Sequence, residues 1–83
     1  MKVLYFAWLR ERIGPGEEEI DAPAHVKTVG DLVTWLAQRG EQYAHAFENA
    51  RVVRAAIDRA HVPAETPIAG AREIAFFPPM TGG

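Results

Sequence analysis

The sequence predicts a single α+β domain, in which a mixed sheet of four to five strands packs on one main helix. Two observations predict this class. Short segments rich in β-branched and aromatic residues recur near the start, past the middle and at the end of the chain. Between them lies one segment whose apolar residues follow the helical period. A chain of 83 residues supplies enough apolar side chains for one core and too few for two.

The first strand is predicted over Lys2–Leu9, a short segment rich in Val, Tyr, Phe and Trp. Lys2 marks the outer face of this strand. Because side chains alternate between the faces of a sheet, we expect Leu4, Phe6 and Trp8 to point away from the core. The glycines and proline of residues 14–16 predict a turn.

Residues 17–20 predict a second strand that pairs with the first, and its acidic run is typical of a solvated edge. Thr28 followed by Asp31 predicts the start of the main helix. Apolar residues then recur at the spacing of one helical face, at Val29, Leu32, Val33 and Leu36. Gly40 is typical of a helix stop, and a shorter helix is predicted over 41–48.

The third strand is predicted over residues 52–57, and His61-Val62 predicts a very short fourth. Glu73 to Phe77 predicts the last strand, which must end at Pro78-Pro79 because proline donates no ladder hydrogen bond. Alternation places Phe77 outward. One long helix covers one face of a sheet, so the other face would expose Leu4, Phe6, Trp8 and Phe77.

An exposed apolar face of that kind on a small protein indicates a partner. The alternative is that the sheet curls and these side chains form a minor second core. The net charge of −2 comes without a basic stripe, which argues against nucleic acid as a partner. No apolar segment approaches the ~20 residues of a membrane span, and no signal-peptide pattern is present, so a cytoplasmic protein is expected.

Side-chain catalysis has few candidates in this chain. Cys and Ser are absent, which excludes disulfides, thiolate metal sites, Cys nucleophiles and Ser-His-Asp triads. The three histidines, His25, His45 and His61, lie far apart without metal-ligand spacing, so we expect no metal site. The chain is therefore not expected to be an enzyme on its own.

The C-terminus carries the most specific signal. Residues 1–77 are predicted to form the domain and residues 78–83 a flexible tail that ends in Gly82-Gly83. Pro78 and Pro79 would stiffen the exit of this tail, which could reach roughly 20 Å when extended. Glycine permits the close backbone approach that a narrow active site on another protein demands. A frayed end without function is the alternative.

A free terminal carboxylate becomes reactive only after activation. Adenylation converts it to a mixed anhydride, and a sulfur donor that replaces AMP leaves a nucleophilic thiocarboxylate. In such a scheme the chain supplies the reactive terminus, and a partner supplies substrate binding and general acid–base catalysis.

The opening residues 2–11, the stretch 52–58 and the ending 73–83, with its Phe-Phe-Pro-Pro-x-x-Gly-Gly pattern, resemble the family of molybdopterin synthase small subunits. The resemblance runs over the whole chain. It implies a β-grasp, ubiquitin-like fold in which the first and last strands are parallel neighbours. It also implies that the domain binds no cofactor of its own, and that ATP is used by an E1-like adenylyltransferase, which activates Gly83.

In that family, the tail enters the large subunit of a heterotetramer and passes sulfur to cyclic pyranopterin monophosphate. The resemblance therefore implies that the catalytic pocket belongs to the large subunit. The tail residues that it implies inside this pocket are Met80, Thr81, Gly82 and Gly83.

Family interface positions correspond to Phe6, His61 and Phe77, although the family often has an apolar residue at the position of His61. Arg10 corresponds to a contact with the activating enzyme. We add three residues to the expected interface because they lie beside these positions: Trp8, Pro78 and Pro79.

Other acceptors for the same carboxyl chemistry stay open, namely thiazole synthesis, tRNA thiolation or conjugation to lysines. The thiazole carriers are usually shorter and lack the Phe-Phe-Pro-Pro ending. A further alternative is a plain interaction module whose tail is inert.

Overall fold

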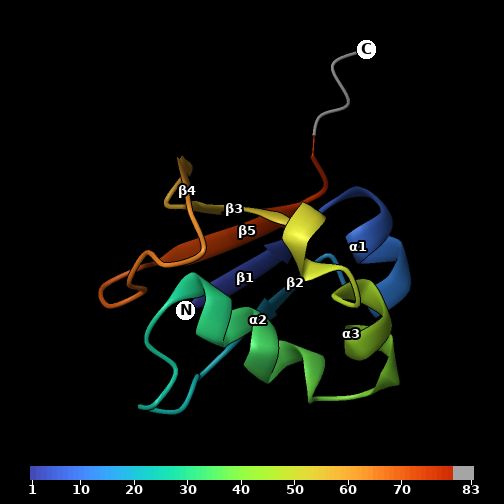
Figure 1. Cartoon of the computed structure of the whole chain (residues 1–83), viewed down its shortest axis with the longest axis horizontal. Helices are drawn as coiled ribbons and strands as arrows, with labels where there is room; N and C mark the ends of the chain where they lie inside the picture. The colour runs from blue at the N-terminus through green and yellow to red at the C-terminus, as the bar shows by residue number, and fades with distance from the viewer. Residues whose placement is uncertain (80–83) are drawn as a thin grey trace.

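Five strands form one mixed sheet in the computed structural model, which describes residues 1–79 (Figure 1). The strand order is β2-β1-β5-β3-β4, with β1 and β5 parallel and the other neighbouring pairs antiparallel. The strands are β1 (Lys2–Tyr5), β2 (Glu17–Glu19), β3 (Arg54–Ile57), β4 (Ala60–Val62) and β5 (Glu73–Phe77). This architecture is the predicted α+β, β-grasp fold, and the expected parallel pairing of first and last strands is confirmed.

Helices lie on one side of the sheet (Figure 1). They are α1 (Ala7–Ile13), α2 (Val29–Ala37) and α3 (Glu41–Ala46), and a 3-10 turn, η1 (Ala50–Val52), precedes β3. The main helix begins as predicted, because Thr28 accepts a hydrogen bond from the Asp31 N–H at 3.1 Å and Asp31 accepts one from the Thr28 N–H at 3.2 Å. This reciprocal capping box satisfies N–H groups that the first turn would otherwise leave unpaired.

The core is formed where the helices meet the inner face of the sheet. Val3, Ile74 and Phe76 from the two central strands are fully buried, as are Leu32 and Leu36 from α2. These residues alternate along their strands or follow one helical face, so the apolar pattern of the sequence places them correctly. No helix in the described range 1–79 is long and apolar enough to cross a membrane.

The predicted first strand is too long. It ends at Tyr5, and Ala7–Ile13 forms a helix instead. The chain changes direction at Ala7, whose φ of 54° lies in the left-handed region. Alternation therefore fails after Phe6: Ala7 is exposed, although alternation placed it inward. Leu9 and Ile13, one helical turn apart, are the residues that α1 buries.

Smaller differences from the sequence prediction lie at the ends of other elements, including the third and fourth strands. The third strand starts at Arg54 rather than at residue 52, because Ala50–Val52 forms the 3-10 turn. The very short fourth strand is confirmed as Ala60–Val62, joined to β3 by a two-residue turn. Asp58 and Arg59 in this turn both have positive φ, at 47° and 75°, which matches the twist that a tight hairpin demands.

The domain boundary stays a prediction. The last strand ends at Phe77 as the two prolines require. Of the predicted tail, only Pro78 and Pro79 belong to the described residues, and both are half-buried. The other four residues, Met80 to Gly83, lie outside the described part of the chain.

Candidate functional site

The parallel strands β1 and β5 end at the same edge of the sheet. Phe6 follows β1 directly and donates its backbone N–H to the Phe76 carbonyl oxygen at 3.1 Å. Phe77 ends β5, and Pro78 leads into the tail. Because this pairing is part of the central ladder of the sheet, the root of the tail is fixed to the most buried part of the fold.

The face of the sheet opposite the helices carries a row of small and apolar side chains. The strand register places Leu4, Ala75, Ala56 and His61 side by side across four strands. Leu4, Ala75 and Phe77 are half-buried. Within residues 1–79 no helix covers this face (Figure 1). We call it the open face, and its residues are Leu4, Phe6, Ala56, His61, Ala75 and Phe77.

Phe6 is the most unusual residue of the open face. Its side chain is 49% exposed, and among the described residues it is the exposed large hydrophobic side chain. The solvation of a phenyl ring is unfavourable and would be relieved by a partner. The outward positions predicted for Leu4, Phe6 and Phe77 are confirmed.

His61 lies against the root of the tail. The centroid of its imidazole ring is 5.0 Å from the ring centroid of Phe77, with the planes tilted by 51°. Ala56, the register partner of His61, has a small side chain that leaves room for the ring. The structure therefore brings together Phe6, Phe77 and His61 at one end of the open face, three residues that lie far apart in sequence.

Trp8 does not point outward from a strand as the sequence analysis expected. It lies on α1, where its ring packs against the core, and the Arg12 guanidinium carbon is 4.6 Å from the ring centroid. The reason is the turn at Ala7, after which residues follow the helical period rather than the strand period.

Arg10 is exposed on the same helix. Its side chain lies close to Gly16 in the turn before β2, where an added Cβ would come within 3.0 Å of Nε. Arg10 is thus near the tail-bearing end of the sheet, because the Gly16 carbonyl accepts the N–H of Tyr5 at the end of β1.

Glu18 is a residue whose role the sequence analysis missed. The acidic run was expected to be a solvated edge, yet the Glu18 carboxylate accepts hydrogen bonds from Tyr5 at 2.8 Å and Tyr43 at 2.7 Å. Arg39 lies 3.4 Å from the same carboxylate. Strand alternation could have predicted this position. Successive side chains of a strand point to opposite faces, so when Glu17 and Glu19 face solvent, Glu18 faces the core.

This cluster joins β1 and β2 to α3. Burial and the hydrogen bond to Glu18 raise the pKa of Tyr5 well above its usual range, and the same two causes raise the pKa of Tyr43. Both hydroxyls therefore stay protonated donors at neutral pH. The cluster fixes β1 beneath the open face and does not form part of it.

No group of three or more His, Asp or Glu side chains converges within residues 1–79.

The comparison with known families decides how the tail-bearing edge is understood. The model of the ThiS family matches residues 3–83, which is almost the whole chain and includes its glycine end. The chain belongs to the ThiS family.

Two curated relatives of this ThiS-family chain match it over their whole length. It is 36% identical to the molybdopterin synthase sulfur carrier subunit of Escherichia coli, over 83 residues that cover 100% of this chain and 99% of the relative. It is 37% identical to the protein of the same name from Haemophilus influenzae, with the same coverage. The resemblance inferred from the termini is therefore confirmed.

Solved structures confirm the ubiquitin-like fold of this ThiS-family member. SAMP1 from Haloferax volcanii superposes with a TM-score of 0.71 at 25% identity, covering 99% of this chain and 97% of that one. A protein described as a putative molybdopterin converting factor, subunit 1, from Pyrococcus furiosus gives a TM-score of 0.74 at 27% identity, covering 95% of each chain.

Proposed function

We propose that this chain is the sulfur-carrying subunit of a molybdopterin synthase. The observation that carries the proposal is the match to two molybdopterin synthase sulfur carrier subunits along the full length, at 36% and 37% identity. The ThiS-family match extends to the final residue, Gly83. Both matches include the C-terminal tail, so a function of the domain alone would not account for them.

The reactive group is the α-carboxylate of Gly83. An E1-like adenylyltransferase transfers AMP from ATP to this carboxylate and releases pyrophosphate. A sulfide-level donor then attacks the carbonyl carbon, AMP leaves with its electron pair, and a thiocarboxylate remains. Its sulfur forms a bond to a carbon of cyclic pyranopterin monophosphate, and an oxygen substituent of that carbon leaves with its electron pair. Water then cleaves the acyl–sulfur bond, which returns the carboxylate of Gly83 and leaves the sulfur on the substrate as a thiol.

The domain acts as a handle for this terminus. The root of the tail is held by the β1–β5 ladder, so docking of the domain fixes where residues 80–83 enter the partner. The large subunit covers the open face through Phe6, Phe77 and His61, with Pro78 and Pro79 beside them. Burial of the exposed Phe6 ring supplies apolar driving force for this contact. The assembly is a cytoplasmic heterotetramer of two large and two small subunits.

Arg10 contacts the activating enzyme. Its exposed guanidinium at the tail-bearing end suits a carboxylate on that enzyme. Trp8 packs against the core and stacks under Arg12, so it contributes to the interface through the position of α1 and the part of its ring that stays accessible.

Intact-mass measurement tests the chemistry. The purified chain is incubated with an E1-like enzyme, ATP and a sulfide source, and its mass should increase by the exchange of one oxygen for one sulfur. Deletion of Gly83 is the matched variant, because it shortens the tail by one residue, moves the terminal carboxylate onto Gly82 and leaves residues 1–79 unchanged, and it should gain no sulfur.

Absence of this mass change in the intact chain would count against the proposal. Adducts in which Gly83 is joined to lysine side chains would instead support a protein modifier. Recovery of a large subunit in complex with the intact chain would assign the acceptor pathway.

A further inference from the structure

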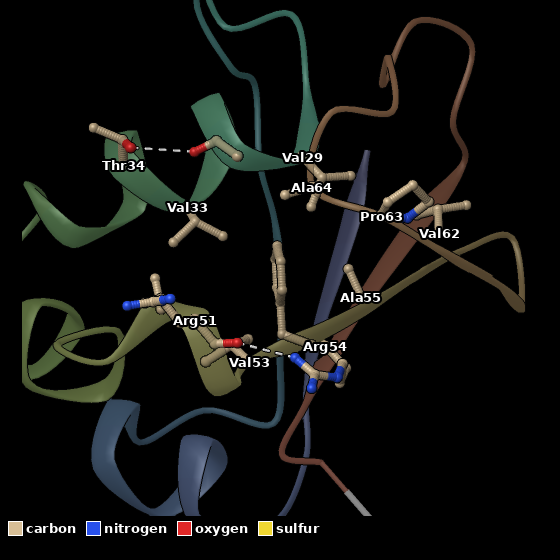
Figure 2. A pocket seen from close by; sticks show the side chains of 13 residues that line it. Val29, Val33, Thr34, Arg51, Val53, Arg54, Ala55, Val62, Pro63 and Ala64 are labelled. Atoms are coloured by element: carbon tan, nitrogen blue, oxygen red, sulfur yellow. Dashed lines mark hydrogen bonds between the residues drawn. The ribbon is translucent and has the colours of Figure 1, made fainter.

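A second surface feature lies away from the open face, in an apolar groove between α2 and the segment that follows β4 (Figure 2). The groove has a volume of about 270 Å³, and its floor is formed by Ala55 and the fully buried Phe76. Val33, Val53 and Val62 form its sides and are each half-buried. Their solvent-exposed methyl groups give the groove an apolar lining.

Backbone hydrogen bonds join the start of α2 to the segment after β4 and fix the position of these two walls of the groove. The Gly30 N–H donates to the Ala64 carbonyl at 2.8 Å, and the Val29 N–H donates to the Thr66 carbonyl at 3.0 Å. These two donors belong to the first turn of α2, where no intrahelical acceptor exists. The groove is therefore preformed, and an occupant would not have to open it.

Two arginines stand at one end of the groove. Arg51 and Arg54 are exposed, and Figure 2 shows them across the cavity from Ala64. Arg54 donates one hydrogen bond to the Arg51 carbonyl at 3.0 Å. Among the ion pairs of the described residues, neither guanidinium has a carboxylate partner.

Asp31 and Glu65 are sequence neighbours of groove residues but do not line the groove. Asp31 on α2 accepts the backbone N–H groups of Lys27 and Thr28, at 3.0 Å and 3.2 Å. Glu65 follows Ala64 directly. Among the described residues, the charged side chains that line the groove are therefore those of Arg51 and Arg54, beside an apolar centre.

We propose that this groove binds a short extended segment of a partner protein, in which aliphatic side chains are followed by Asp or Glu. The volume is slightly below the roughly 300–1,000 Å³ of pockets that hold drug-sized ligands, which favours one or two aliphatic side chains over a cofactor. The guanidinium forks match carboxylates in geometry as well as in charge.

This site is separate from the sulfur chemistry. Its lining comes from α2, the segment 50–55, the segment 62–64 and Phe76 of β5, and includes neither Phe6 nor Phe77. A protein held in the groove could therefore stay bound while the tail is in the active site of another protein. The inference does not depend on the identity of the sulfur acceptor.

Methyl NMR of the full chain tests the proposal, with acetyl-Val-Leu-Val-Asp-Glu-Asp-amide as the probe. The methyl signals of Val33, Val53 and Val62 should shift saturably, with a dissociation constant below ~1 mM. The control peptide acetyl-Val-Leu-Val-Asn-Gln-Asn-amide has the same shape without charge and should bind at least about tenfold more weakly.

A charge exchange gives the sharpest control. The double variant R51E/R54E should lose the acidic peptide and bind acetyl-Val-Leu-Val-Lys-Lys-Lys-amide, whereas R51Q/R54Q should bind neither charged peptide tightly. Both positions are exposed, so an unchanged spectrum outside the groove shows that the variants are folded.

Four results would overturn the proposal. The first is no shift of groove signals at millimolar acidic peptide, and the second is equal binding of the uncharged peptide. Groove signals that change when the chain is truncated after Pro79, without peptide, would assign the groove to the tail of this chain. Signals that depend on protein concentration would assign it to a second copy.

Discussion

The two faces of the sheet use the same strands for opposite purposes. On β5, Phe76 is fully buried against the helices, and its neighbour Phe77 lies half-buried on the open face. On β1, Tyr5 is buried, and Phe6 is 49% exposed. Adjacent aromatic residues therefore separate into one set that stabilises the domain and one set available to a partner.

The largest expected effect comes from the buried face. Phe76→Ala should lower the free energy of unfolding by about 3–5 kcal/mol, because it removes a fully buried ring and leaves a cavity among Tyr5 and Phe47. Denaturant unfolding measures the change. Phe77→Ala is the matched control and should cost much less, and equal losses for the two variants would contradict the separation of the faces.

On the open face, we expect a substitution to weaken partner binding and to leave the stability of the domain almost unchanged. Phe6→Ala should weaken binding of the large subunit by about 2 kcal/mol, or roughly thirtyfold, because exposed aromatic anchors dominate interface energies. The free energy of unfolding should change by less than about 0.5 kcal/mol. Calorimetric titration with the large subunit measures the change in affinity, and denaturant unfolding measures the change in the free energy of unfolding. An unchanged affinity would remove Phe6 from the interface.

The Glu18 cluster beneath the open face should give a smaller and pH-dependent effect. Tyr43→Phe removes one hydrogen bond to a carboxylate and should cost about 1–2 kcal/mol at pH 7. The folded-state pKa of Tyr5 and of Tyr43 is raised above the usual tyrosine value of 10.0, so the folded state retains protons that the unfolded state loses. Stability should therefore be fully present below pH 10 and fall above it.

Denaturant unfolding measured between about pH 8 and about pH 11.5 compares the unmodified chain with Tyr43→Phe. This range spans the pKa of about 10 at which a tyrosine in the unfolded chain ionises. The decline above about pH 10 should be steeper in the unmodified chain than in Tyr43→Phe, since the variant has lost one of the two titrating groups. Equal slopes would mean that the Tyr43 hydroxyl is not coupled to folding.

The sequence predicted the parts of the fold that depend on local periodicity. Residues 73–77 and the helix that begins at Thr28 carry one uninterrupted pattern each, bounded by proline or by a capping residue, and both are confirmed. Phe6 and Phe77 were placed outward by alternation alone. Their meeting with His61 could be expected only from the family resemblance, because a register across several strands is a tertiary property.

The failure at α1 has a specific cause. The segment from Lys2 to Leu9 has strand-like composition throughout, yet the chain turns at Ala7, where a residue with a Cβ adopts a φ of 54°. Positive φ costs energy locally and is maintained by surrounding packing, here by burial of Leu9 and Ile13. Composition carries no sign of such a turn, whereas the spacing of Leu9 and Ile13 was an available helical signal.

The groove at Arg51 and Arg54 could not be found from the sequence. It arises from four separate segments, 29–34, 50–55, 62–64 and Phe76, that the sheet order and the Gly30–Ala64 hydrogen bond bring together. No single one of these segments shows a motif.

The most direct test of the account replaces only the terminal carboxylate. A chain prepared with a Gly83 carboxamide keeps every residue and should still bind the large subunit, because the open face is untouched. An amide cannot be adenylated, so the account predicts no thiocarboxylate and no sulfur transfer to cyclic pyranopterin monophosphate, while the carboxylate form supports both. Sulfur transfer by the amidated chain would contradict the account.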